Sequence, residues 1–513
     1  MAPLRRAVAV PAPAVELRGI TKRFGPVLAN DRVDLLVEAG TIHGIVGENG
    51  AGKSTLMNIL YGYYRADAGT VAIDGEPRRI GRPIDAIRAG IGMVHQHFML
   101  VEPFTVLENM LLGAEGGPLL ASGVARLRAS LARLGREHGL EVDPDARVGD
   151  LPVGLQQRVE ILKALCRGAR VLILDEPTGV LTPQEADELF AILAGLRAQG
   201  RTVVLITHKL REVMAATDRV SVMRGGRMVA HRRTSETSRE ELAELMVGRK
   251  VQMRPDRRPA RPGRPVLEVR GLEVADDRGV PRVKSVTFEV RAGEIVGIAG
   301  VAGNGQSELL EAIAGIRAPT RGEIRIDGRS VGGSAEGRPR GFGHVPEDRL
   351  RMGLVPDLPA CENAVLGYHR RPDYVTSGLL RRRRIVEICS GWLERYDIRP
   401  RAPMLPAIAF SGGNQQKLVV ARELEHDPEL LLVGQPTRGV DIGAIEFIHG
   451  RLLAMRDAGK AVLLVSVELD EILALADRIL VMFDGRIVGE LPAERAEERR
   501  IGLLMAGIAA EAA

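Results

Sequence analysis

Aromatic residues, cysteines and long hydrophobic runs are scarce in this chain. Aromatic side chains make up 3% of the 513 residues, and one residue is tryptophan. The cysteines Cys166, Cys361 and Cys389 share no spacing of a metal or redox site, so we expect reduced thiols. No segment approaches the run of about 18 apolar residues that a membrane span needs. The sequence therefore argues against an integral membrane protein.

A large excess of one charge is also missing. The 71 basic and 66 acidic residues leave a formal net charge of +5, which by itself does not favour nucleic-acid binding. With 45% hydrophobic and 27% charged residues, the composition is that of a soluble globular protein. The run AVAVPAPAV at residues 7–15 contains two prolines and no convincing signal-peptide core. We expect residues 1–15 to form a disordered leader.

The sequence does contain a complete phosphate-binding pattern, GxxxxGK[ST], within GENGAGKST. An apolar strand pattern precedes it at residues 42–46 and a helical pattern follows it, which is the context that a phosphate cradle requires. In such a loop the backbone N–H groups face the β-phosphate, the lysine reaches the β/γ oxygens and the serine hydroxyl serves Mg²⁺. The predicted ATP-binding loop comprises Gly47, Glu48, Asn49, Gly50, Ala51, Gly52, Lys53, Ser54 and Thr55.

The same module is written a second time without these groups. Gly47 corresponds to Gly300, 253 residues later, and Gln306 in GVAGNGQSE replaces the lysine. The apolar run VLILDE, which ends at Glu176, corresponds to LLLVGQ, which ends at Gln435. We therefore predict a tandem duplication. Its parts would be a first domain over 16–249, an Arg/Pro-rich linker over 250–265 and a second domain over 266–508.

Further motifs point to one protein family. In the second half, AFSGGNQQK places a Ser-Gly-Gly turn before an amphipathic helix, and the first half repeats this layout as LPVGLQQR. The segment LITHKL places His208 after the next strand. In order and spacing these motifs resemble the ATP-binding cassette (ABC) ATPases over nearly the whole chain. The resemblance implies an α/β fold with two P-loop NTPase cassettes, each with a helical signature subdomain.

The resemblance implies roles for more residues of the first half. Asp175 would hold Mg²⁺, and the adjacent Glu176 would act as general base on the attacking water. His208 would contact the γ-phosphate, and Gln96 in MVHQHFML would reach Mg²⁺ and link the site to membrane partners. Phe24 fits two interpretations equally well, an aromatic stacked on adenine or a core aromatic. The implied Mg²⁺ ligands are Ser54, Gln96 and Asp175.

Cassettes of this family face each other head to tail, so the resemblance also implies two composite ATP sites. Site one joins the first half's loop and acidic pair to the second half's signature turn, and it is complete. Its signature residues are Ser411, Gly412, Gly413, Asn414 and Gln415. Site two has lost its catalytic groups, and the positions concerned are Pro152, Gln306, Glu347, Gly434, Gln435 and Val467. We expect ATP hydrolysis at site one alone.

Within the family, the chain is similar to importers of simple sugars and nucleosides, and most to the purine-nucleoside branch. Segments such as QPTRGVDIGAIEFIHG support this, while Pro152, Gly179 and Val467 depart from it. The resemblance implies a peripheral ATPase subunit at the cytoplasmic face of the membrane, with ATP and Mg²⁺ as cofactors. Its partners would be two membrane-spanning permease subunits and an extracytoplasmic substrate-binding lipoprotein, without direct nucleic-acid contact. The alternative is a soluble tandem-cassette ATPase acting on ribosomes or nucleic acid.

Overall fold

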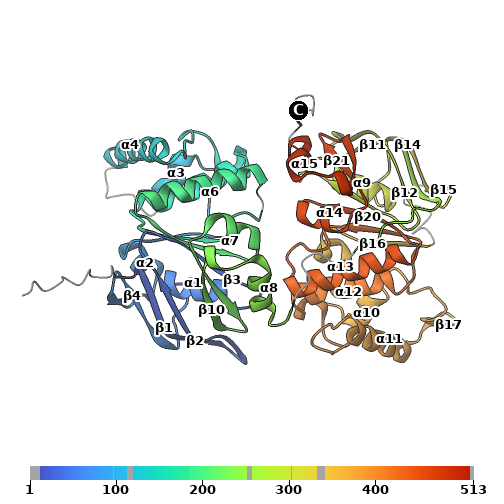
Figure 1. The fold of residues 1–513 in the computed structure, drawn as a ribbon, viewed down its shortest axis with the longest axis horizontal. Helices are drawn as coiled ribbons and strands as arrows, with labels where there is room; N and C mark the ends of the chain where they lie inside the picture. Colours follow the sequence, from blue (N-terminus) through green and yellow to red (C-terminus); the bar gives the residue numbers. More distant parts are fainter. Residues whose placement is uncertain are drawn as a thin grey trace, which may run out of the picture. The chain divides into compact units, whose positions relative to one another are not determined.

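The computed structural model describes residues 12–95, 98–112, 120–179, 181, 183–250, 257–301, 303–331, 341–505 and 507–508. The chain divides into two compact units, Met1–Val251 (unit 1) and Gln252–Ala513 (unit 2). Each unit is an α/β fold with a closely similar order of strands and helices (Figure 1). The predicted duplication of α/β modules is therefore confirmed.

Unit 1 contains two sheets. Its strands are β1 (Val15–Phe24), β2 (Val27–Val37), β3 (Ile42–Gly47), β4 (Ala68–Ile73), β5 (Glu76–Arg78), β6 (Ile91–Val94), β7 (Val171–Asp175), β8 (Thr202–Thr207), β9 (Arg219–Arg224) and β10 (Arg227–Arg233). Its helices are α1 (Lys53–Tyr61), α2 (Pro83–Arg88), α3 (Val106–Leu111), α4 (Leu120–His138), α5 (Val153–Cys166), α6 (Pro183–Ala198), α7 (Leu210–Ala216) and α8 (Arg239–Val247). The antiparallel sheet has the order β2-β1-β4-β5, and the central sheet has the order β10-β9-β3-β8-β7-β6.

Unit 2 repeats this plan. Its strands are β11 (Pro265–Ala275), β12 (Pro281–Arg291), β13 (Ile295–Ala299), β14 (Arg321–Ile326), β15 (Arg329–Ser330), β16 (Phe342–Val345), β17 (Val375–Thr376), β18 (Leu379–Leu380), β19 (Leu430–Gly434), β20 (Ala461–Ser466), β21 (Arg478–Phe483) and β22 (Arg486–Pro492). Its helices are α9 (Gln306–Ile313), α10 (Ala360–Ala364), α11 (Arg382–Arg395), α12 (Gly412–Leu424), α13 (Ile442–Asp457), α14 (Leu469–Leu475) and α15 (Glu498–Met505). The central sheet, β16-β19-β20-β13-β21-β22, matches that of unit 1.

The central sheet of unit 1 collects the motifs at one edge. Strands β3, β7 and β8 are buried along their whole length, as expected for apolar runs covered on both faces. They are parallel neighbours, so their C-terminal ends meet at the same edge. Gly47 ends β3, Asp175 ends β7, and His208 directly follows β8. Segments that are more than 100 residues apart in the chain thus converge there.

A group of helices covers part of each central sheet. In unit 1, α3, α4 and α5 share an apolar core that includes Val106, Leu131 and Val159. In unit 2, α10, α11 and α12 do the same with Cys361, Trp392 and others. In Figure 1, α3 and α4 lie at one end of unit 1, and α10 and α11 lie at one end of unit 2. Within the described residues, no helix is both long and apolar enough to cross a membrane.

Two segments differ from the expected boundaries. Ala14 and Val15, assigned to the disordered leader 1–15, are buried, and Val15 begins β1 because it pairs with both β2 and β4. The end of the expected linker 250–265 is also bound to unit 2. The N–H of Gly263 donates to the carbonyl of Ala292 at 2.8 Å, and Arg257 donates to the carbonyl of Ala476. Residues 1–11 and 251–256 lie outside the described residues.

Candidate functional site

The phosphate loop of unit 1 needs glycine at two positions for steric reasons. Gly52 precedes α1 with φ +99, and a Cβ there would lie 2.3 Å from the carbonyl oxygen of Ala29. A Cβ on Gly47 would lie 2.4 Å from the carbonyl oxygen of Met223. Such separations are far below van der Waals contact, so only glycine fits. The loop backbone is thus pressed against two neighbouring strands and held in a single shape.

Lys53 lies at the start of α1 with its charge turned back over the loop. Its side chain is 5% exposed, and Nζ donates to the carbonyls of Gly47 at 2.9 Å and Glu48 at 3.1 Å. Burial lowers the pKa of Lys53, and the nearby carboxylates of Glu176 and Asp175 oppose that shift. The ammonium is therefore prepositioned for a phosphate and already satisfied without one.

Asp175 and Ser54 form the part of the site that fits a metal ion. The Ser54 hydroxyl hydrogen-bonds the carboxyl of Asp175, whose pKa is raised mainly by burial. Oδ1 of Asp175 is buried and has no hydrogen-bond partner among the described residues. An orphaned buried carboxylate oxygen is costly and calls for an explanation. Together with a hydroxyl, it is the oxygen donor set that Mg²⁺ prefers.

Glu176 and His208 are brought into direct contact. Oε1 of Glu176 lies 2.9 Å from Nδ1 of His208, and the two side chains are 18% and 22% exposed. Burial alone would raise the pKa of Glu176, but the hydrogen bond and charge of His208, with the charge of Lys53, bring that pKa below its usual value. Glu176 also has φ +47, an unusual angle for a non-glycine residue that is typical of functional sites. The carboxylate is thus ionised at neutral pH.

The remaining predicted site residues of unit 1 differ in their exposure and in their contacts. The N–H of Ala51 donates to the carbonyl of Glu48 at 3.1 Å inside the loop, where Asn49, Gly50 and Ser54 are exposed. Phe24 is 41% exposed, with its ring 5.1 Å from that of Tyr64. It is therefore not a core aromatic. Thr55 is half-buried in α1, and Gln96 lies outside the described residues.

The signature turn of unit 2 is tightly packed. Ser411 precedes α12, and its Oγ accepts a hydrogen bond from Nδ2 of Asn414 at 2.8 Å. A Cβ on Gly413 would lie 2.9 Å from Oδ2 of Asp441, and a Cβ on Gly412 would lie 2.6 Å from a guanidinium nitrogen. Gln415 is buried, and its Nε2 donates to the carbonyl of Ala407 at 3.1 Å. The N-terminus of α12 is thus presented on a fixed scaffold.

Two residues that the sequence did not single out support these groups. Arg349 donates from Nε to Oε1 of Gln415 at 3.2 Å and from Nη1 to the carbonyl of Arg438 at 3.0 Å. It is the guanidinium that crowds Gly412. In unit 1, the buried Glu212 accepts hydrogen bonds from the hydroxyls of Thr178 and, at 2.7 Å, Thr207. In the sequence, the one indication of their role is that each residue lies close to a motif.

In unit 2, neutral glutamines stand at the positions of Lys53 and Glu176, and their side chains hydrogen-bond to the backbone of the same unit. Nε2 of the buried Gln306 donates to the carbonyl of Val301 at 3.0 Å, in the place of the lysine contact. Oε1 of Gln435 accepts from the N–H of Val467 at 3.2 Å. Gln435 keeps φ +47, the same angle as Glu176. The fold of this edge is therefore retained while its acid and base groups are absent.

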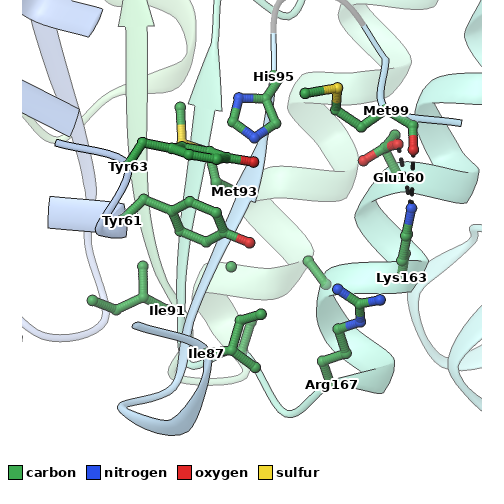
Figure 2. A pocket seen from close by; sticks show the side chains of 13 residues that line it. Tyr61, Tyr63, Ile87, Ile91, Met93, His95, Met99, Glu160, Lys163 and Arg167 are labelled. Carbon is green, nitrogen blue, oxygen red and sulfur yellow. Dashed lines mark hydrogen bonds and ion pairs between the residues drawn. The ribbon is translucent and has the colours of Figure 1, made fainter. Parts of the chain in front are cut away.

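A pocket of about 120 Å³ opens beside the phosphate loop helix of unit 1 (Figure 2). Tyr61, Tyr63 and His95 form one wall, with ring centroids 5.5–5.9 Å apart. Glu160, Lys163 and Arg167 of the α5 segment line the opposite side. Nζ of Lys163 donates to the carbonyl of Met99 at 3.1 Å. The pocket thus has an aromatic wall facing a charged one.

Comparison with known proteins gives a consistent result. The pattern of the ABC transporter family matches residues 30–179 and 283–438. The nucleoside import ATP-binding protein NupA of Lactococcus lactis is 45% identical over 96% of this chain and 98% of its own length. The guanosine import ATP-binding protein NupO of Bacillus subtilis is 46% identical over 96% and 97%. The glucose import ATP-binding protein TsgD13 of Haloferax volcanii is 46% identical over 96% of both chains.

Proposed function

The chain belongs to the ABC transporter family and is an ATPase, and we propose that its ATP hydrolysis drives the uptake of a nucleoside or a simple sugar. The observation that carries this proposal is the edge of the unit 1 sheet, where Lys53, Asp175, Glu176 and His208 meet at the phosphate loop. Among the residues of unit 2 that the structure describes, there is no equivalent set. The expected result is one hydrolytic site per chain.

The residues of unit 1 divide the chemistry among them. The loop N–H groups and Lys53 hold the phosphates. Glu176 accepts the proton of the attacking water, because its lowered pKa keeps it ionised. His208 uses Nδ1 to orient Glu176, so we assign its Nε2 to the γ-phosphate. Ser54, Asp175 and Gln96 are the residues that would hold Mg²⁺, which supplies positive charge to the phosphate oxygens when bound.

The second component of this site is the signature turn of unit 2. We propose that Ser411 and the N-terminal N–H groups of α12 complete the site across from the phosphate loop of unit 1, in the head-to-tail pairing of the family. The support lies in how the substitutions segregate. Pro152 occupies the position in the unit 1 signature that corresponds to Ser411 in the unit 2 signature. In the head-to-tail pairing, the unit 1 signature would serve the degenerate site, although the signature itself belongs to unit 1. If the units did not pair in this way, random substitutions would have no reason to affect the unit 1 signature together with the catalytic positions of unit 2.

We propose that permease subunits dock at the pocket of Figure 2 and at the adjoining segment 99–104. That segment exposes apolar side chains, with Met99 58%, Val101 37% and Phe104 39% exposed. Exposed apolar groups beside the aromatic wall of Tyr61 and Tyr63 suit a short amphipathic helix of a partner. The subunit would then act at the cytoplasmic face of the membrane through these contacts.

The transported compound is assigned by relatives alone. The nucleoside and glucose importers that the chain resembles differ by one percentage point in identity, 45% and 46%. Identity therefore does not separate a nucleoside from a monosaccharide. Ligand binding by the extracytoplasmic binding protein of the same transporter tests the assignment. A nucleoside or a simple sugar should bind, and a protein that takes neither would overturn it.

Steady-state ATP turnover of the assembled transporter tests the catalytic assignment. Glu176→Gln should lower turnover by about 10²- to 10⁴-fold, the usual cost of losing a general base, while ATP still binds. Glu137→Gln, on the exposed side of α4, is the matched control and should turn over at the wild-type rate. A Glu176→Gln transporter that hydrolyses ATP at full speed would refute the assignment.

A further inference from the structure

Arg349 of unit 2 joins three segments that are far apart in the chain. It lies in the segment that follows β16. Its guanidinium donates from Nε to Oε1 of Gln415 at 3.2 Å, in the first turn of α12, and from Nη1 to the carbonyl of Arg438 at 3.0 Å, in the loop after β19. A planar guanidinium donates in fixed directions, so two such bonds set the position of both partners. One side chain therefore ties the signature turn to the loop after β19.

The backbone that carries Arg349 is itself held in place. Oδ1 of Asp348 accepts hydrogen bonds from the N–H groups of Leu350 at 3.0 Å and Arg351 at 3.1 Å. Arg349 is half-buried, and burial lowers its pKa while the charge of Asp348 opposes that shift. An arginine in a protein nevertheless stays protonated at neutral pH. A cation thus stands at a fixed place beside the signature turn.

Gly412 leaves the space that this guanidinium fills. A Cβ on Gly412 would lie 2.6 Å from Nη2 of Arg349 and 3.1 Å from the carbonyl oxygen of Gly439. Unit 1 has Val153 at the position of Gly412, and its segment after β6, residues 95–105, contains no arginine. The arginine and the space for it therefore occur together in the signature assigned to site one, and both are missing from the signature of the degenerate site.

The place of this charge favours an anion at the turn. Gly412 begins α12, and the N-terminus of a helix carries a partial positive charge, so a cation beside it is unfavourable on its own. The arrangement becomes favourable when an anion lies at the same turn, because the helix N–H groups and the guanidinium then attract the same charge. The γ-phosphate of ATP in site one is such an anion.

We propose that Arg349 is a positioning residue of site one, which holds the N-terminus of α12 in the orientation in which Ser411 meets the γ-phosphate of ATP bound in unit 1. Arg349 acts through Gln415 and the loop after β19, and not by contact with the nucleotide. This inference rests on the proposed function and deepens it, because it names a residue of unit 2 on which hydrolysis in unit 1 depends.

Steady-state ATP turnover of the assembled transporter carrying Arg349→Ala tests the proposal. The kcat should fall about 10- to 100-fold, since a small displacement of a positioned group has an effect of this size, and KM for ATP should change less. Arg349→Lys keeps the charge but not the two directed hydrogen bonds, so it should recover only part of the lost kcat. Arg351→Ala, at an exposed position two residues later, is the matched control and should turn over at the wild-type rate.

A double-mutant cycle separates positioning from a general need for a folded unit 2. Arg349→Ala and Gln415→Leu remove the two ends of one hydrogen bond, so the double variant should lose hardly more kcat than the more impaired single variant. If Arg349→Ala lowers the melting temperature or does not assemble, Arg349→Lys takes its place in the cycle.

Three results would overturn the proposal: a wild-type kcat in the Arg349 variants, a loss confined to KM, or independent losses that multiply in the double variant. The proposed function is tested apart from these results. Full turnover by the Glu176→Gln transporter would refute the catalytic assignment in unit 1, whatever the Arg349 variants do.

Discussion

Asp175 and Glu176 are neighbours in the chain, yet their surroundings push their acidities in opposite directions. Burial raises the pKa of Asp175, whereas the contact with His208 and the charge of Lys53 outweigh burial and lower the pKa of Glu176. Separated environments for adjacent carboxylates are a common way to divide acid–base roles. Here they leave one carboxylate with an orphaned oxygen for a cation and the other ionised as a base.

A buried histidine away from this site gives a prediction about stability. Nε2 of His43 lies 2.7 Å from Oγ of Ser221, which lies 2.7 Å from Nδ1 of His231. Burial, with the charges of His231 and Arg219, lowers the pKa of His43 to about 3. Because the unfolded chain has the ordinary value of about 6.5, it binds more protons than the folded chain between these values, and stability falls as pH falls below about 6.5.

The expected loss between pH 8 and pH 5.5 is about 1.4 kcal/mol from His43 alone. Urea unfolding at both pH values measures it. His43→Gln should show a smaller loss of stability on acidification than the wild type by about that amount, and His369→Gln, at an exposed position, should not. Equal pH dependence of the wild type and His43→Gln would contradict the burial argument.

At the scale of single elements, the phosphate loop depends on contact as well as on backbone angle. Gly52→Ala should abolish ATP binding, because its Cβ would lie 2.3 Å from the carbonyl oxygen of Ala29. Gly139→Ala is the control: Gly139 also has positive φ, +67, but a Cβ there has nothing within 4 Å. It should lower stability by about 1 kcal/mol and leave ATP binding intact. Measuring the ATP affinity and melting temperature of both variants distinguishes backbone strain at positive φ from a steric clash of the added Cβ. Unchanged ATP affinity in Gly52→Ala would contradict the steric explanation.

The two signature helices give a second element-scale prediction. Ser411→Ala removes the hydroxyl that Asn414 hydrogen-bonds and that we assign to site one, so ATP turnover should fall about tenfold or more. Pro152→Ser, at the start of α5, restores a hydroxyl in the degenerate site and should raise turnover little. Turnover of the two assembled variants is the measurement. A larger effect from Pro152→Ser than from Ser411→Ala would invert the assignment of the sites.

Local pattern was enough to predict the strands and the loop. β7 is apolar up to Asp175, β3 is apolar or glycine except for His43, and each strand leads directly into its polar motif. Local pattern could not predict contacts between residues that are far apart in the chain and meet only in the folded structure. Arg349 reaches the carbonyl of Arg438, 89 residues away, and Glu347 covers Gly434 at a similar separation. The leader was predicted too long because pairing of Val15 with two strands outweighs a proline-rich local sequence. Gln96 stays a prediction.

At the scale of the whole molecule, the chain should find a membrane only through its partners. The motivation is the exposed apolar segment beside the pocket of Figure 2 and, within the described residues, the lack of a helix able to cross a bilayer. Flotation with protein-free liposomes should leave the chain in solution, and co-expression with its permease subunits should bring it to the membrane fraction. Tight binding to bare lipid would count against docking through permeases.

The central claim is that two cassettes in one chain share a single hydrolytic site. Within the part of the chain that the structure describes, the buried lysine, the serine–aspartate pair and the glutamate–histidine contact occur together in unit 1 alone. Unit 2 has a neutral Gln306 and Gln435 at the corresponding places. Repairing one of them, as in Gln306→Lys, should not revive hydrolysis there, since Gln435 still cannot act as a base.

Trapping the assembled transporter with vanadate during turnover and counting ADP per chain tests this claim most directly. Vanadate captures ADP at sites that have just hydrolysed ATP. We predict about one trapped ADP per two-cassette chain, located in unit 1 and lost in Glu176→Gln. Two trapped ADP molecules per chain, with both units labelled, would contradict the single-site account.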